Sequence, residues 1–223
     1  MTLRSDSTPS LISPDVVASN FNDNKPIQKP VRLGIMASGN GSNFEAVAQA
    51  IHDGQLKATI QVVVYNNSDA FVATRAANWD IPSVLLNHRE YPNREAFDSK
   101  IVETLREYDV ELVIMAGWMR LVTPVLIDAW TNKIINIHPS LLPSFKGTRA
   151  IEQALESGVK IAGCTAHLVC LEMDSGPILM QAAVPILPDD TSETLHARIQ
   201  KQEHRILPMA IAIAASNGLY FLP

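Results

Sequence analysis

The stretch that decides the fold is Val31-Arg-Leu-Gly-Ile-Met-Ala-Ser-Gly-Asn-Gly-Ser-Asn43. Its first half is a short apolar run that predicts a buried strand. The run ends in the loop 38–41, whose glycines allow backbone conformations that other residues avoid. Ser42 then stands where a helix N-cap belongs, with Glu45 three residues later as a capping-box partner. Strand, glycine loop and helix in this order are typical of the start of an α/β domain.

Strand and helix patterns alternate along the rest of the chain. Continuous apolar strands separated by helices indicate a parallel sheet that is covered on both faces. After residue 160, two longer runs joined by the turn Asp174-Ser-Gly-Pro177 predict an antiparallel pair. The predicted fold is therefore α/β: a Rossmann-like, mostly parallel sheet with helices on both faces and an antiparallel C-terminal part. The predicted strands are 31–37, 60–65, 84–86, 112–116, 134–137, 163–171 and 178–186, and the predicted helices are 42–54, 70–79, 94–108 and 192–215.

Residues 1–30 differ from the rest of the chain. Fourteen of them are Ser, Thr, Asn or Pro, and apolar residues are scattered. A secretory signal would need a positive start followed by an unbroken apolar run, and neither is present. We therefore expect a polar, disordered tail over 1–30 and one folded domain over 31–223.

Composition argues against several classes of protein. The 223 residues include 18 Lys+Arg and 23 Asp+Glu, which gives a formal net charge of −5. A broad nucleic-acid surface needs clustered positive charge, so we expect no nucleic-acid partner. The apolar runs are far shorter than the roughly 18–20 residues that cross a bilayer, so we expect no membrane span. Two cysteines, Cys164 and Cys170, are too few for a disulfide framework, which favours a cytoplasmic protein.

The glycine loop after the first strand is a candidate phosphate site. A helix that starts after glycines presents unpaired N–H groups and the positive end of its dipole, and these bind anions without a lysine. Here the N–H groups belong to Gly41, Ser42 and Asn43. A dinucleotide fingerprint would need glycine where Phe44 stands, and an acidic residue where Asn66-Asn67 follow the second strand. The alternative is a glycine turn that only reverses the chain.

A candidate catalytic segment, Asn136-Ile-His-Pro139, follows a buried strand. Residues two apart on a strand point the same way, so Asn136 and His138 project together. Open α/β sheets bind their ligands at the carboxyl ends of such strands. A histidine there can exchange a proton, and a neighbouring amide can donate to an oxyanion. Taken alone, a histidine at a strand end is more often a structural hydrogen-bonding residue.

Four separate segments, in the right order, resemble the phosphoribosylglycinamide formyltransferases, the folate-dependent enzymes of purine synthesis. The resemblance extends from about Val31 to Ala215. It implies the formyltransferase fold, a catalytic domain over 31–223, and transfer of a formyl group from 10-formyltetrahydrofolate to the amine of 5′-phosphoribosylglycinamide. The four segments are the loop 38–43, the strand end 136–143, the turn 174–177 and the helical stretch 202–208.

The resemblance also implies roles for individual residues. Asn136 and His138 would stabilise a tetrahedral oxyanion, His138 would donate a proton, and Asp174 would hold its imidazole. The residues implied for the ribonucleotide are Gly41, Ser42, Asn43, Gln200, Lys201, Gln202 and Glu203. Those implied for the folate are Arg94, Met119, Arg120, Leu121, Val122, Asn136, Cys170, Leu171, Glu172, Met173 and Asp174.

Several alternatives stay open at the level of sequence. A hydrolase of 10-formyltetrahydrofolate shares the His and Asp segments but carries an N-terminal regulatory domain, for which thirty polar residues are too few. Formyltransferases of methionyl-tRNA add a C-terminal domain, whereas this chain ends just after its last helix. An NAD(P)-dependent oxidoreductase on a Rossmann-like sheet and a non-catalytic binding module are the other candidates. We expect two small-molecule substrates, no metal, and a monomer or weak homodimer.

Overall fold

The computed structural model describes residues 11–14 and 29–216. Its eight strands form one sheet in the order β1-β8-β7-β6-β5-β2-β3-β4. The strands are β1 (Leu11–Ser13), β2 (Val31–Ala37), β3 (Ala58–Tyr65), β4 (Ser83–Leu85), β5 (Leu112–Met115), β6 (Ile134–His138), β7 (Ile161–Leu168) and β8 (Ile178–Pro185). The helices are α1 (Ser42–His52), α2 (Val72–Asn78), the 3-10 turn η1 (His88–Glu90), α3 (Arg94–Glu107), α4 (Pro124–Ala129), α5 (Ala150–Glu156) and α6 (Ser192–Ser216).

The middle of the sheet is parallel. Strands β6, β5, β2, β3 and β4 pair side by side in one direction, and Ile35 of β2 lies between Val63 of β3 and Ile114 of β5. The strand order reverses between β2 and β5, because β3 continues on one side of β2 and β5 lies on the other. Open α/β sheets bind ligands at such a switch point. The α/β prediction, with its mostly parallel sheet, is confirmed.

The C-terminal part is antiparallel, as predicted. Strand β7 runs against both β6 and β8. Strand β1 pairs with the outer edge of β8, with Ile12 opposite Ala182. Residues 11–13 therefore form an edge strand within the segment that we expected to be disordered, and Ile12 packs on the core while Leu11 faces outward. Residues 1–10 and 15–28 of that expected tail lie outside the described part of the chain.

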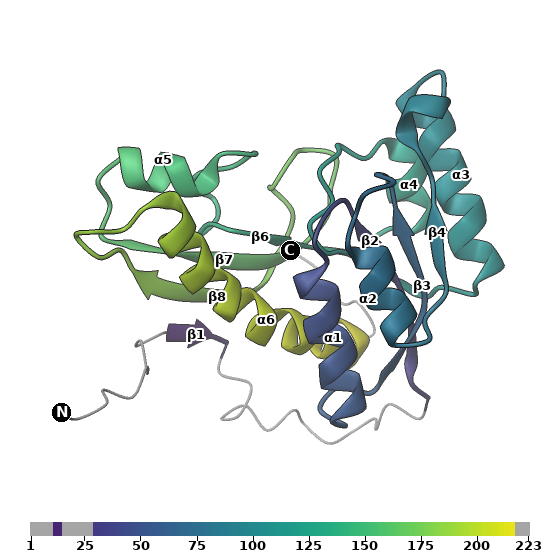
Figure 1. The fold of residues 1–223 in the computed structure, drawn as a ribbon, viewed down its shortest axis with the longest axis horizontal. Helices are drawn as coiled ribbons and strands as arrows, with labels where there is room; N and C mark the ends of the chain where they lie inside the picture. The colour runs from purple at the N-terminus through teal and green to yellow at the C-terminus, as the bar shows by residue number, and fades with distance from the viewer. Residues whose placement is uncertain (1–10, 15–28, 217–223) are drawn as a thin grey trace.

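Helices cover both faces of the sheet. Helices α1, α2, α5 and α6 pack on one core, which is centred on residues such as Leu33, Phe44 and Ile206. Helices α3 and α4 pack on a second core around Met36 and Ile101. Figure 1 shows α6 running along β7 and β8 until it meets α1. This packing brings the middle of α6 against the start of α1.

Some local predictions were wrong. Helix α1 has Gly41 at its N-cap, and Glu45 binds Arg75 and Trp79 instead of closing a capping box. Helices α4 and α5 were not predicted, because six and seven residues are too few to show a helical period. Strand β7 ends at Leu168, so 169–171 belong to a loop.

Candidate active site

The predicted catalytic and phosphate segments meet at the carboxyl ends of β2, β5 and β6. Ser38, directly after β2, joins two of these ends. Its N–H donates to Gly117 O at 3.1 Å, and its hydroxyl accepts from Met119 N at 2.9 Å. The glycine loop and the segment 117–122 are thus joined by one backbone–backbone hydrogen bond and one backbone–side-chain hydrogen bond.

His138 lies at the end of β6, with only 6% of its surface exposed. Its Nε2 lies 2.9 Å from Phe145 O, and its Nδ1 lies 3.5 Å from Asp174 Oδ2. Both ring nitrogens therefore face acceptor oxygens, and only a doubly protonated ring can donate to both. Phe145 reaches this position in the left-handed region, at φ 55°, which is uncommon for an aromatic residue.

Asp174 is brought to His138 by the loop between β7 and β8. Its Oδ2 also accepts from Gly147 N at 2.9 Å, and its Oδ1 lies 3.7 Å from His167 Nε2. Burial acts to raise the pKa of Asp174, but the hydrogen bonds from His167 and Gly147 and the charges of both histidines outweigh it and lower the pKa. Asp174 is therefore a carboxylate at neutral pH.

His167 is a site residue that the sequence interpretation missed. It stands opposite Asn136 in the pairing of β6 with β7, and its Nε2 lies 3.2 Å from Asn136 Nδ2. It also lines the same cavity as Asn136, His138 and Asp174. Only the register of the two strands reveals this position, since the sequence shows a histidine in the middle of an apolar run.

A cavity of about 330 Å³ opens beside these residues. Nine of the residues implied for the folate line it, and exposed apolar side chains such as Met119, Leu121 and Leu171 lie at this site. A concave, largely apolar site with a few polar groups is typical of small-molecule binding. The nine are Met119, Arg120, Leu121, Val122, Asn136, Cys170, Leu171, Met173 and Asp174.

Two residues implied for the folate do not line this cavity. Arg94 is the exposed first residue of α3. Glu172 points outward, with its side chain 77% exposed, and pairs with Lys146 at 3.2 Å. Their roles toward a folate stay predictions.

Trp118 also lines the cavity and was not predicted. It stacks on Phe97 of α3, with ring centroids 6.0 Å apart and an interplanar angle of 4°. The Arg120 guanidinium lies 5.8 Å from the Phe97 centroid. Trp118 Nε1 and Arg120 Nε are buried without a hydrogen-bond partner in the described structure. Neither of these two donors is accessible to solvent in the described structure.

The predicted ribonucleotide residues meet where α6 packs against the start of α1. Gln200 Nε2 donates to Ser42 Oγ at 3.0 Å, and Asn43 Nδ2 donates to Glu203 Oε2 at 2.9 Å. Gly41 has φ 76°, and a Cβ there would lie 2.5 Å from Val72 Cγ2, so this position requires glycine. Burial raises the pKa of Glu203, against the opposing effects of the Asn43 hydrogen bond and the charge of His196.

The other two members of the predicted set are placed differently. Gln202 is buried and accepts from Arg205 Nη1 at 2.9 Å. Lys201 is exposed on α6. The structure therefore brings Gln200 and Glu203, three residues apart on one face of the helix, to the glycine loop.

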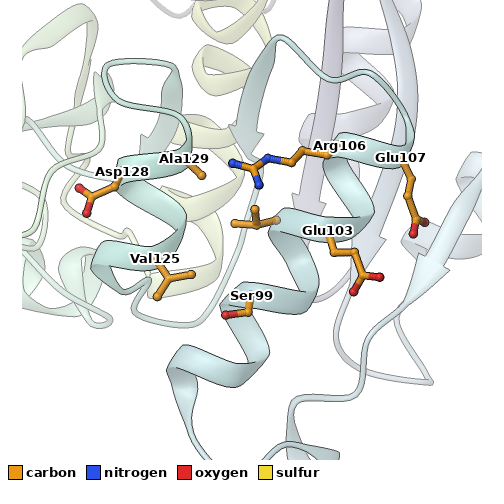
Figure 2. Close-up of a pocket in the computed structure, with 8 residues that line it drawn as sticks. Ser99, Glu103, Arg106, Glu107, Val125, Asp128 and Ala129 are labelled. Carbon is orange, nitrogen blue, oxygen red and sulfur yellow. The ribbon is translucent and has the colours of Figure 1, made fainter.

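A second hollow of about 730 Å³ lies between α3 and α4 (Figure 2). Its lining includes charged side chains, among them Glu103, Arg106 and Asp128. The described residues that line it include none of the predicted site residues. The chemistry-bearing residues gather instead at the strand ends.

Two further properties concern residues 11–14 and 29–216. No group of three or more His, Cys, Asp or Glu in these ranges is arranged to hold a metal ion. No helix in these ranges is both long and apolar enough to cross a membrane.

Comparison with known proteins identifies the family. Residues 31–211 match the formyl transferase family. The phosphoribosylglycinamide formyltransferase of Bacillus subtilis (strain 168) is 44% identical over 180 residues, which cover 81% of this chain and 92% of that protein. The trifunctional purine biosynthetic protein adenosine-3 of Bos taurus is 40% identical over 191 residues, and this chain spans only 19% of its length.

A solved structure shares the fold. The crystal structure of glycinamide ribonucleotide transformylase 1 from Symbiobacterium toebii has a TM-score of 0.82 and 45% identity, and the match covers 83% of this chain and 88% of that one. The family match over residues 31–211 includes the whole parallel half of the sheet and the site loops 38–41 and 170–174. The chain therefore belongs to the formyl transferase family.

Proposed function

We propose that this chain transfers the formyl group of 10-formyltetrahydrofolate to the amine of 5′-phosphoribosylglycinamide, a step of purine synthesis. The observation that carries the proposal is the His138–Asp174 pair, at 3.5 Å, beside an apolar cavity and close to a glycine loop at a helix start. An acid–base group, an apolar pocket for the folate and an anion site are the three parts that this reaction needs. Residues 31–223 would form the catalytic domain.

The ribonucleotide would bind across the start of α1. The N–H groups of Gly41, Ser42 and Asn43 would hold its phosphate at the positive end of the helix dipole. The Ser42 hydroxyl accepts from Gln200, so its own proton is free to turn toward a phosphate oxygen. Glu203 would accept from the hydroxyl groups of the ribose or from the glycinamide end.

The folate would occupy the cavity between residues 117–122 and the loop 170–174. The apolar side chains Met119, Leu121 and Leu171 would cover the pterin ring. The formyl group would lie toward Asn136 and His138, which line the same cavity.

The chemistry would proceed through a tetrahedral intermediate. The amine nitrogen attacks the formyl carbon, a C–N bond forms, and the carbonyl electrons move to oxygen. The side-chain N–H of Asn136 and the His138 imidazolium stabilise this oxyanion, and for this the His138 Nε2–H would exchange its contact with Phe145 O for the substrate. When the intermediate collapses, the bond to the folate nitrogen breaks and that nitrogen gains a proton from His138. The amine nitrogen then gives up its own proton to the neutral His138 imidazole, which restores the imidazolium. Asp174 holds the His138 ring in place throughout and stabilises it when it is charged.

One assay tests the proposal. The full chain is mixed with 10-formyltetrahydrofolate, and folate absorbance is followed with and without 5′-phosphoribosylglycinamide. Turnover that needs the ribonucleotide supports formyl transfer. Turnover without the ribonucleotide indicates a hydrolase, and the absence of any turnover indicates a binding module. In the active protein, His138→Ala should lower kcat by about 10²–10⁴-fold while the protein stays folded.

We also propose a cytoplasmic enzyme that is a monomer or a weak homodimer. Two unpaired cysteines, one of them buried, suit a reducing compartment. Sedimentation of the full chain over a range of concentrations tests the oligomeric state.

A further inference from the structure

Helix α2 supports the glycine loop from behind. The N–H of Val72 donates to Gly39 O at 3.1 Å, and the Val72 side chain lies against Gly41 so closely that no Cβ fits between them. Two of the loop's four residues thus rest on the first residue of this helix.

Arg75, one turn further along α2, holds a third loop residue. Its Nε donates to Asn40 O at 2.9 Å, and its Nη2 donates to Asn40 Oδ1, also at 2.9 Å. Its third nitrogen, Nη1, donates to Glu45 Oε2 at 3.0 Å. The guanidinium therefore bridges the loop and the first turn of α1 through one planar fork, a geometry that lysine cannot reproduce.

The contact with Asn40 O bears directly on the anion site. That carbonyl and the Gly41 N–H belong to the same peptide group, and in a trans peptide they point in opposite directions. Because the Asn40 carbonyl accepts from Arg75 of α2, the Gly41 N–H points away from α2. A donor at the carbonyl also polarises the peptide and strengthens its N–H as a donor.

The charge of Arg75 is only partly balanced. Glu45 divides its carboxylate between Arg75 and Trp79 Nε1, which donates to Oε1 at 2.8 Å. The Arg75 side chain is 25% exposed, so solvent screens it incompletely. Burial, and after it the positive charge of Arg75, lowers the pKa of His204, which follows Glu203 on α6. The positive charge of Arg75 thus acts on α6, the helix that packs against the start of α1.

We propose that Arg75 is a positioning residue for phosphate binding, which orients the glycine loop and strengthens the Gly41 N–H without touching the substrate. This inference rests on the proposed function. It explains how an acidic chain can hold a phosphate: an arginine behind the loop acts through a peptide group.

The test measures the preference for phosphate. It is the ratio of kcat/KM for the ribonucleotide to kcat/KM for the same glycinamide ribonucleoside without its 5′-phosphate. Arg75→Gln should lower this ratio about five- to twentyfold by raising KM for the ribonucleotide, since a charge-assisted contact is lost. The KM for 10-formyltetrahydrofolate should not change. Arg75→Lys keeps the charge but not the planar fork, so its ratio should lie between that of the unaltered protein and that of Arg75→Gln.

A second variant separates an electrostatic role from a merely structural one. Glu45→Gln keeps an acceptor for Trp79 but removes the negative charge, so it should raise the ratio about twofold. Arg32→Gln is the matched control, because it breaks a similar arginine–carboxylate contact, with Glu111 at 3.3 Å, at the opposite end of β2, and should leave the ratio unchanged.

The outcomes are distinct. If the Arg75 variants change the kinetics of ribonucleotide and ribonucleoside equally, or not at all, the inference is overturned. A fall of the ratio in Glu45→Gln overturns it as well. Failure of the unaltered chain to use the ribonucleotide would instead refute the proposed function.

Discussion

His167 Nε2 lies 3.2 Å from Asn136 Nδ2, across the antiparallel pair of β6 and β7. The other ring nitrogen, Nδ1, lies 2.9 Å from Leu168 O and must carry a proton to donate there. In the protonated ring Nε2 also carries a proton and faces Asp174 Oδ1, 3.7 Å away. In the neutral ring Nε2 is an acceptor instead, so the nitrogen of the Asn136 amide turns toward it. His167 therefore selects one of the two orientations of this amide, and with it the direction of the second Asn136 N–H.

The first prediction concerns this orientation. His167→Phe keeps an aromatic ring but removes the acceptor, so the Asn136 amide can flip. We expect kcat to fall about 10- to 100-fold, short of the loss of a whole oxyanion donor, with both KM values nearly unchanged. Steady-state kinetics measures the effect, and His52→Phe, on the exposed end of α1, is the control. A variant within twofold of the unaltered protein would refute the assigned role.

The second prediction concerns acid stability. The pKa of Asp174 is lowered in the folded protein by His167, Gly147 and His138, which overcome the effect of burial. As the pH falls, the Asp174 carboxylate is protonated in the unfolded chain near the ordinary aspartate pKa of about 3.9, and in the folded protein only at a lower pH. The stability that Asp174 contributes is therefore full above about pH 3.9 and is lost as the pH falls through the lowered pKa. Asp174→Asn should remove this dependence.

Urea unfolding at several pH values between 2.5 and 6 measures this contribution. The difference in unfolding free energy between the unaltered protein and Asp174→Asn should shrink as the pH drops below about 4. The Asn side chain keeps an acceptor for Gly147 N, so the loop has the means to stay in place. A difference that is constant across the whole range would contradict the lowered pKa.

Much of the fold could be predicted because the strands are long enough to show a pattern. The apolar runs of β2, β3, β5 and β6 lie in the core, and such runs are hard to mistake. Of the short elements, the three-residue strand β4 was predicted, but β1, α4 and α5 were not. Strand β1 has three residues and α4 has six, and both depend on contacts with distant parts of the chain.

In the candidate site too, some residues could be predicted from the sequence and others could not. The glycine loop and Asn136-Ile-His-Pro139 stand out locally, because their chemistry and spacing are visible in the sequence. His167 and Arg75 do not, since each acts through a neighbour that is 31 or 35 residues away. Glu45 misled the prediction for the same reason: its capping-box spacing was correct, but its carboxylate accepts from Arg75 of α2 and from Trp79, which follows that helix.

The third prediction concerns Gly176, two residues after Asp174. A Cβ at this position would lie 1.9 Å from Leu168 O, a rigid backbone atom. Gly176→Ala must therefore push the turn away from β7, and we expect a loss of about 1–3 kcal/mol in stability. Since the same turn carries Asp174, kcat should fall as well.

Thermal unfolding and kinetics check this variant. Gly39→Ala is the matched control, because a Cβ there would meet nothing within 4 Å, and its stability should change by less than about 0.5 kcal/mol. Equal stability of the two variants would show that the turn has room to adapt.

The last prediction concerns Glu203, which is 5% exposed and accepts from Asn43 Nδ2, while Asn43 Oδ1 is buried without a partner in the described structure. A protonated Glu203 could donate to that oxygen, and so could a glutamine. Burial raises the Glu203 pKa, so the folded protein binds this proton more tightly than the unfolded chain. Stability should therefore fall as pH rises above the ordinary glutamate pKa of about 4.3, until the raised value is reached.

Glu203→Gln should lack this pH dependence and be the more stable protein at pH 7, with a difference that grows with pH across that window. It should also raise KM for the ribonucleotide, because glutamine offers a single weaker acceptor, while KM for the formyl donor stays the same. Urea unfolding between pH 4 and 8 measures the first effect and steady-state kinetics the second. A Gln variant that is less stable at pH 7 would mean that Glu203 is held as a paired carboxylate, and that its burial is offset by contacts stronger than the one from Asn43.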